Sequence, residues 1–296
     1  MKNCSYLILL MCVLTFGSSC TRNYYYSPQA THNSQISEKG EIAVSAALGK
    51  VGLNDYDGSR ADKEDKYQVQ AAYSPLKHLA ISSSLSFARP NKLSNGTTIG
   101  YDTDFAVGSY LFLNNQNRSR EYKKIGETKS SIEYKERGFL FDAYLTYGRG
   151  QVTNKYGFGR KDMFDYSRYG MKFGMYYRAR TTGGRFNKYF SIGLLVRPAM
   201  LRFSDATIIG PRSSSSQQFL SIVDKKDAIR INEYTLTGQI GVGCIRLFGN
   251  INYIASSREF SYYIDEQAFQ SGILLEVNSL FGKNKGKNRT KRLTGL

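Results

Sequence analysis

The feature that most constrains the fold is an alternation of apolar and polar residues that recurs in ten segments of this 296-residue chain. A period of two is typical of β-strands with one apolar face, because successive side chains of a strand point to opposite sides. Leu79 to Phe87 shows the pattern clearly, with serines between apolar positions. The predicted strands are 42–48, 67–73, 79–87, 101–111, 139–147, 169–177, 190–196, 234–240, 245–253 and 269–281.

The connections alternate in length. Short links cover 74–77, 181–188 and 241–243, and long polar ones cover 50–66, 89–100, 151–168 and 205–228. Short turns on one side and long loops on the other are typical of a transmembrane barrel with periplasmic turns and extracellular loops. The link 114–137 is long and charged where a short turn is expected, so it is either a partly ordered insertion or a sign that the strand count is off by a pair. Pro198 predicts a bulge or bend in the seventh strand, because proline cannot donate to a ladder.

Composition favours the same class. The chain has 23 Tyr, 17 Phe and no Trp, and beyond its first residues no apolar run approaches the roughly 18 residues typical of a membrane helix. A barrel strand needs only about 9–11 residues. The predicted fold is therefore all-β, a single antiparallel up-and-down transmembrane β-barrel of about ten strands with long extracellular loops. Tyrosines near strand ends fit an aromatic girdle, at positions 67, 73, 101, 147, 169, 189 and 253.

The N-terminus is typical of an export signal. Lys2 precedes the uncharged run 6–16, and small residues follow at 17–19. Eleven residues are too few to span a bilayer, so the run predicts a cleaved signal peptide, 1–19. The segment resembles a bacterial lipoprotein signal, which implies that Cys20 is lipidated. An ordinary secretory cleavage with an incidental cysteine is the alternative. The predicted divisions of the mature chain are a periplasmic segment 20–40, a barrel 41–281 and a basic periplasmic tail 282–296.

Cysteine and histidine usage argues against metal, disulfide and catalytic chemistry. After cleavage and lipidation only Cys244 remains free, so no disulfide framework is possible. His32 and His78 are far apart and have no cysteine neighbours at ligand spacing. Neither histidine is expected at the extracellular rim, where barrel enzymes place their proton shuttle. We therefore expect no enzyme, no metal site and no cofactor.

The candidate site consists of charged residues at the polar alternate positions of the strands. They could form an ion path, but a narrow barrel fills its interior with side chains, and buried charges persist there when they are paired. The second interpretation is preferred. The predicted lumen charge network is Asp102, Asp104, Asp142, Lys172, Arg178, Arg246 and Glu276.

The chain is strongly basic, with a net charge of +17. Loss of Lys2 with the signal leaves 40 cations against 24 acids, or +16, and six of those cations lie in the tail 283–292. A periplasmic tail is a poor candidate for binding nucleic acid. Attraction to outer-membrane lipid headgroups or lipopolysaccharide phosphates is expected instead, and a solvated tail with no partner is the alternative.

Three stretches carry a family resemblance. They are YYYSPQATHNSQISEKGEIAVSAALG from Tyr24, AAYSPLKHLAIS from Ala71 and KYFSIGLLVRPAMLRFSD from Lys188. They resemble a family of lipoprotein-type outer-membrane β-barrel proteins of Bacteroidetes-like bacteria, whose role is mostly undefined. The resemblance implies an outer-membrane location.

The leading hypothesis is a monomeric outer-membrane barrel lipoprotein with both termini in the periplasm. It has a structural, adhesion or surface-interaction role through an unknown loop-binding partner. One alternative is a lipid-tethered soluble periplasmic barrel that binds an apolar ligand, with its apolar parity turned inward. Another is a narrow outer-membrane channel. Parity in the sequence does not distinguish inside from outside.

Overall fold

The structure is a computed structural model, and it describes residues 36–52, 63–89, 97–122, 131–155, 161–182, 187–210, 220–221, 228–256 and 267–277. The predicted signal peptide 1–19, Cys20, His32, the end of the last predicted strand at Phe281 and the basic tail 282–296 lie outside these residues. Within them, the structure has no helix of the length and apolar character that crossing a membrane requires.

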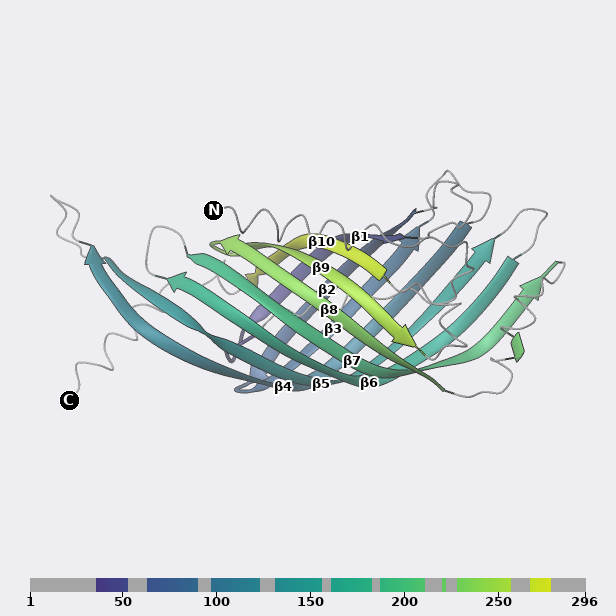
Figure 1. The fold of residues 1–296 in the computed structure, drawn as a ribbon, viewed down its shortest axis with the longest axis horizontal. Helices are drawn as coiled ribbons and strands as arrows, with labels where there is room; N and C mark the ends of the chain where they lie inside the picture. The colour runs from purple at the N-terminus through teal and green to yellow at the C-terminus, as the bar shows by residue number, and fades with distance from the viewer. Residues whose placement is uncertain are drawn as a thin grey trace.

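Ten antiparallel strands close into one barrel, which confirms the predicted fold class (Figure 1). Each strand pairs with its neighbours in sequence, and β1 closes the ring by pairing with β10. The strands are β1 Ile42–Gly52, β2 Lys63–Leu76, β3 Leu79–Arg89, β4 Thr97–Tyr122, β5 Ser131–Lys155, β6 Lys161–Thr182, β7 Lys188–Ile209, β8 Ile229–Val242, β9 Ile245–Ser256 and β10 Gln267–Glu276.

The two ends of the barrel differ. We call one the turn end, where tight turns at 77–78 and 243–244 join strands and where the described chain begins at Ile36 and stops at Val277. The opposite end, the loop end, carries the connection between β7 and β8, in which residues 220–221 form a helical turn. The predicted short links all fall at the turn end, as expected.

The apolar set of alternate residues on each strand faces outward. Leu145 is 58% exposed on β5 and Leu247 is 53% exposed on β9, whereas polar side chains of the other parity are buried in the interior. We call the outward apolar surface the apolar belt. On β5 it covers 139–147, and about nine residues at about 3.3 Å with a tilt near 40° give a height of roughly 20–25 Å. An apolar outside around a polar lumen is the arrangement of a transmembrane barrel, and it is opposite to the parity that a soluble apolar-ligand carrier requires.

Beyond the apolar belt, at the loop end, the apolar and polar faces of the sheet exchange sides. The outward positions become polar at Arg149 on β5 and Arg202 on β7, while inward positions become apolar. These inward residues form a small core, made of Val152, Phe164, Tyr166, Ala199, Leu201, Phe203, Ile231 and Ile254, against which Leu220 packs. A sheet with a polar outer face and an apolar inner face is suited to contact with water on its outer face. The reversal therefore marks the level at which the apolar surroundings of the belt end.

Several predicted connections are wrong because strands continue through them. The segment 151–168 was predicted as a long loop, but β5 reaches Lys155 and β6 begins at Lys161. The link 114–137 is also strand, since β4 and β5 pair as far as Tyr122 and Ser131. It is an ordered hairpin extension, so the strand count is not off by a pair. In Figure 1 this hairpin projects past the other strands at the turn end, and β7 projects at the loop end.

At Pro198 the β6–β7 ladder is interrupted, but it has no bulge there. The β6–β7 ladder runs from the pair Gly170–Ala199 to Phe173–Val196 with no change of register, and it has no pair at Pro198. The register shift of this ladder lies instead between Asp165 and Tyr166, opposite 203–205. Proline removes a donor but tolerates an extended backbone, so the ladder loses contacts at Pro198 without gaining a residue.

Candidate functional site

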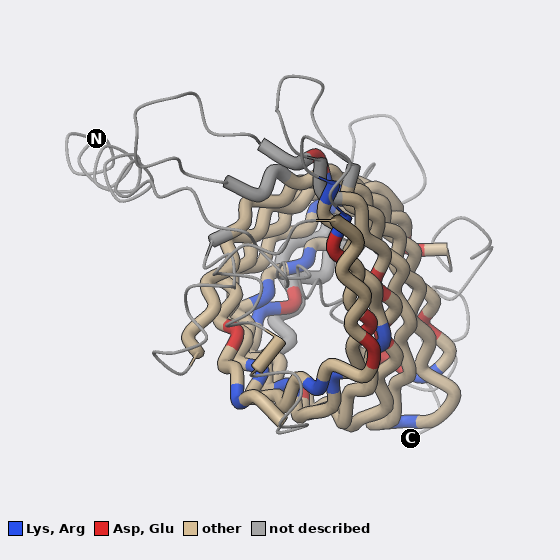
Figure 2. Tube along the Cα trace, turned by 90° about the vertical axis from the view of Figure 1, so that its right-hand side faces the viewer, with Lys and Arg blue, Asp and Glu red and all other residues tan. Residues whose placement is uncertain are grey.

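The candidate site is the polar lumen. All seven residues of the predicted charge network project into it, and Figure 2 shows charged residues distributed along the barrel wall. They belong to three groups at different depths, between the loop end and the turn end, rather than to one network.

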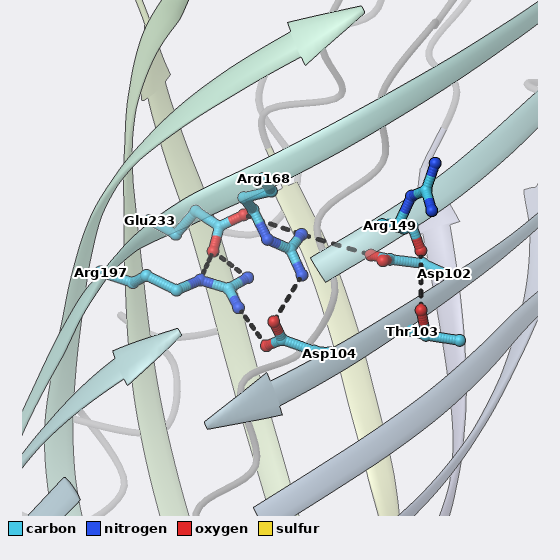
Figure 3. Close-up of polar contacts among 7 residues, drawn as sticks. All are labelled: Asp102, Thr103, Asp104, Arg149, Arg168, Arg197 and Glu233. Atoms are coloured by element: carbon cyan, nitrogen blue, oxygen red, sulfur yellow. Dashed lines mark hydrogen bonds and ion pairs between the residues drawn. The ribbon is translucent and has the colours of Figure 1, made fainter. Parts of the chain in front are cut away.

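The first group, the loop-end cluster, is Asp102, Asp104, Arg168, Arg197 and Glu233 (Figure 3). Arg168 approaches Asp102 at 3.2 Å, Asp104 at 3.5 Å and Glu233 at 3.9 Å. Arg197 donates from Nη1 to Asp104 Oδ2 at 2.8 Å and from Nε to Glu233. The side chains of both arginines are at most 1% exposed.

The loop-end cluster joins strands that are not neighbours. Asp102 and Asp104 come from β4, Arg168 from β6, Arg197 from β7 and Glu233 from β8. Its ion pairs therefore cross the lumen as well as following the wall. Charges buried this deeply are tolerated only when they are paired and hydrogen-bonded. The cluster fixes the cross-section of the barrel and fills it with side-chain atoms.

The middle group contains Asp142 and Lys172. Asp142 accepts hydrogen bonds from the Tyr176 hydroxyl and the Gly174 backbone. Lys172 Nζ lies 4.3 Å from the centre of the Tyr144 ring. Tyr176 is fully buried, and its ring lies over Gly193 on the neighbouring strand. The lumen at this depth holds the side chains of Tyr144, Tyr176, Asp142 and Lys172.

Glycine at position 193 leaves the space that the Tyr176 ring occupies. A Cβ at position 193 would collide with Tyr176 Cδ1. We expect Gly193→Ala to lower the free energy of unfolding by about 1–3 kcal/mol, the usual cost of overpacking. Urea unfolding in micelles measures it. Gly238→Ala is the control, since nothing lies within 4 Å of its added Cβ, and equal losses in both variants would contradict the packing account.

The third group, the turn-end cluster, is centred on Glu276. Arg246 Nη2 donates to it at 2.5 Å and Arg180 Nη2 at 3.2 Å. Arg180 lies on β6 and Glu276 on β10, so this pair also crosses the lumen. Arg178 Nη2 lies 3.8 Å from Glu136, and Arg246 stacks on the Tyr189 ring at 3.7 Å.

The N-terminal turn, residues 36–41, enters the lumen beside this cluster. Gly40 has a φ of 78°, a conformation that favours glycine, and its N–H donates to Ser74 at 2.7 Å. Ile36 is 1% exposed and packs in a lumen core with Tyr110, Tyr144 and Tyr176. Arg178 Nη1 donates to Ser37 Oγ at 2.6 Å. The N-terminal turn therefore fills the barrel at the turn end.

Glu41 holds the N-terminal turn together. Its Oε2 accepts from the backbone N–H of Ser37 at 2.8 Å and of Glu38 at 3.2 Å. Burial raises the pKa of Glu41 above its ordinary value, and the nearby Arg178 and Arg246 only partly offset this. The folded state therefore binds a proton more tightly than the unfolded state does.

This raised pKa predicts pH-dependent docking of the N-terminal turn. Stability is fullest below the unfolded pKa near 4.5 and falls as the pH rises through the window above it. We expect amide hydrogen exchange of 37–41, corrected for intrinsic rates, to lose protection over that window. Glu41→Gln should flatten the dependence. An unchanged pH profile in that variant would assign the effect to another group.

Uncharged polar residues line the rest of the wall, on β8, β9, β10 and β2. Gln270 Nε2 donates to Gln68 at 2.7 Å, and Thr235 Oγ1 donates to Asn252 at 2.6 Å. Neither amide atom of the fully buried Asn250 has a hydrogen-bond partner among the described residues. Within the described ranges, no group of three His, Cys, Asp or Glu side chains could hold a metal ion.

The sequence prediction missed several members of these clusters. Arg168 fell in the predicted loop 151–168, and Glu41 and Glu233 each stand one residue before a predicted strand. Arg197 stands one residue after the predicted strand 190–196. Extending the polar alternate positions by one residue beyond each predicted strand end would have found Glu41, Arg168, Arg197 and Glu233.

No protein-family model and no curated protein matches this chain. Among solved structures, one matching chain is described as "KdgM porin". That match has 9% sequence identity and a TM-score of 0.28, and it covers 79% of this chain and 98% of that chain. A TM-score this low carries no argument about function.

Proposed function

We propose that this protein is an outer-membrane β-barrel whose lumen is filled by its own side chains and whose role is structural or adhesive. The observation that carries the proposal is that the barrel is apolar on its outer surface and polar in its lumen. Leu145 and Phe173 face outward at mid-belt, whereas Arg168, Arg178 and Arg197 are buried inside. In a bilayer a closed barrel with this parity satisfies every backbone group and buries its apolar surface.

The lumen supports a role without catalysis or wide transport. Its charges are paired across the barrel at two depths, and the middle is filled by Tyr144 and Tyr176. Such pairing stabilises a scaffold, because each paired charge is held in place by its partner. In this proposal the connections at the loop end provide surfaces for partners.

We further propose that the turn end faces the periplasm and that Cys20 carries a lipid anchor there. Barrels of this class put short turns in the periplasm and long connections outside. The described chain begins and stops at the turn end, at Ile36 and Val277. An anchor sixteen positions before Ile36 would then lie on the same side.

Fractionation tests the membrane assignment. The full chain should leave purified outer membrane only with detergent, and it should migrate faster on gels before heating than after. Protease added to whole cells should cut 205–228 and spare 283–292. Release of the folded Cys20→Ala variant into buffer would refute a transmembrane barrel, because it would leave the lipid as the sole membrane contact.

A narrow channel is the second candidate, favoured by the uncharged wall that contains Asn250. Water molecules are the natural partners for its two amide atoms. Planar-bilayer recording separates the candidates. A filled lumen predicts no resolved conductance steps, whereas reproducible steps that Asn250→Leu lowers would establish a channel.

A further inference from the structure

The outer surface carries a row of basic residues where the apolar belt ends at the loop end. Arg149 follows Tyr147 on the outward parity of β5, and Arg202 follows Met200 on that of β7. Both arginine side chains are exposed. On these strands they are the first outward polar positions beyond the belt, so in a bilayer they stand at headgroup level.

The strand register brings the two arginines together. Ser167 on β6 pairs with Arg149 on one side and with Arg202 on the other. The two backbones are therefore two strand spacings apart, or about 10 Å. Between them stands only the short serine side chain, so both guanidinium groups can reach one anion above Ser167. Arg230 adds a third cation one row nearer the turn end, since it is exposed on β8 opposite Met200.

The nearest outward acids do not occupy this row. Asp165 and Asp205 pair with each other one step farther toward the loop end, and Asp165 accepts a hydrogen bond from Gln151 at 2.6 Å. They lie on the water side of the arginines. At the other end of the belt the corresponding cations are lysines, because Lys135 and Lys188 pair with Thr181 from its two sides, while Arg137 shares its row with Ala179 and Phe190. Lysine is a point charge and has no guanidinium fork.

We propose that Arg149, Ser167 and Arg202, with Arg230 beside them, form a binding site for the phosphate of an anionic lipid headgroup in the leaflet at the loop end. The proposal rests on the proposed membrane location. Arginine forks match phosphate oxygens in pairs of parallel hydrogen bonds, and Ser167 can donate a third. The acyl chains of the same lipid would lie on the apolar belt below, against Tyr147 and Tyr169.

Native mass spectrometry of the full chain, folded in uncharged detergent, tests the site. The probe is a diphosphorylated lipid A, titrated beside the same lipid with its phosphates removed. We expect the R149Q/R202Q variant to bind the phosphorylated lipid about 10- to 30-fold more weakly, from two lost cations at a lipid surface. The dephosphorylated lipid should bind wild type and variant alike.

The matched control is R137Q/K188Q, which removes two cations from the opposite rim and should change binding less than about twofold. Equal losses in the two double variants would overturn the site in favour of general charge attraction. Inorganic phosphate that competes at the lipid's own concentration would show that the headgroup is not the ligand. R149K/R202K keeps both charges but removes both guanidinium groups. Lipid binding equal to that of wild type would therefore refute the proposed pairs of parallel hydrogen bonds to the phosphate.

Failure of the membrane assignment is recognised separately. A protein that stays in buffer without detergent would disprove the proposed function whatever its lipid binding. A detergent-dependent barrel whose R149Q/R202Q variant binds lipid normally would remove only the phosphate site. Heat-dependent gel mobility of each variant checks that the barrel has folded.

Discussion

Replacing Arg197 by methionine is expected to lower the free energy of unfolding by about 3–5 kcal/mol, the usual effect of breaking a buried ion pair. Arg197 bonds both Asp104 and Glu233, and its side chain is 1% exposed. Without it, three carboxylates of the loop-end cluster face one arginine, Arg168. Urea unfolding in uncharged micelles, followed by tyrosine fluorescence and gel mobility, measures the loss.

Two further variants test the cause of this loss. Arg202→Gln removes an exposed arginine from the opposite face of the same strand and should change stability by less than about 0.5 kcal/mol. Adding Glu233→Leu to Arg197→Met removes an acid that has lost its closer arginine and should restore part of the loss. If the double variant loses more free energy of unfolding than the two single variants lose together, the pairing account is wrong.

Placing a charge on the apolar belt is expected to have the next largest effect. Leu145→Arg puts a cation inside the apolar belt on β5, where the side chain points outward and is 58% exposed. In a bilayer this should cost about 2–4 kcal/mol. Unfolding in lipid vesicles measures the cost, which should be greater in vesicles than in micelles.

The control is Gln151→Arg, the same new residue on the same outward parity beyond the belt. It should cost no more than about 1 kcal/mol, the value near the bilayer interface. In a soluble barrel the exposed Leu145→Arg would be harmless and would improve solubility. Equal effects of the two substitutions in vesicles would therefore argue against the membrane location.

The alternation predicted all ten strands, because a strand with one apolar face repeats its pattern every second residue. It predicted their ends poorly. On β5 the outward run of apolar residues stops at Tyr147, whereas Val152 farther along β5 and Phe164 on β6 face inward. A pattern that changes face mid-strand looks like a loop, so 151–168 was misassigned.

The candidate site was predicted by residue type more than by arrangement. Asp102, Asp104 and Glu276 follow from polar parity alone. Their partners do not, because Arg168 and Arg197 meet Asp104 across strands that are distant in sequence. No spacing in the chain encodes which acid a lumen arginine will reach, since the number of strands and their stagger set the distances across the barrel.

The pattern of residues is sufficient to predict strands with one apolar and one polar face, joined by short links at 74–77 and 241–243; in the structure these turns lie at 77–78 and 243–244. Which face is outside follows only from the closed barrel. A two-residue repeat is the same whichever way the sheet curls, so the choice appears only when β1 pairs with β10 and one face becomes the lumen. Closure also brings the N-terminal turn and its buried Ile36 inside the barrel, where they fill the lumen at the turn end.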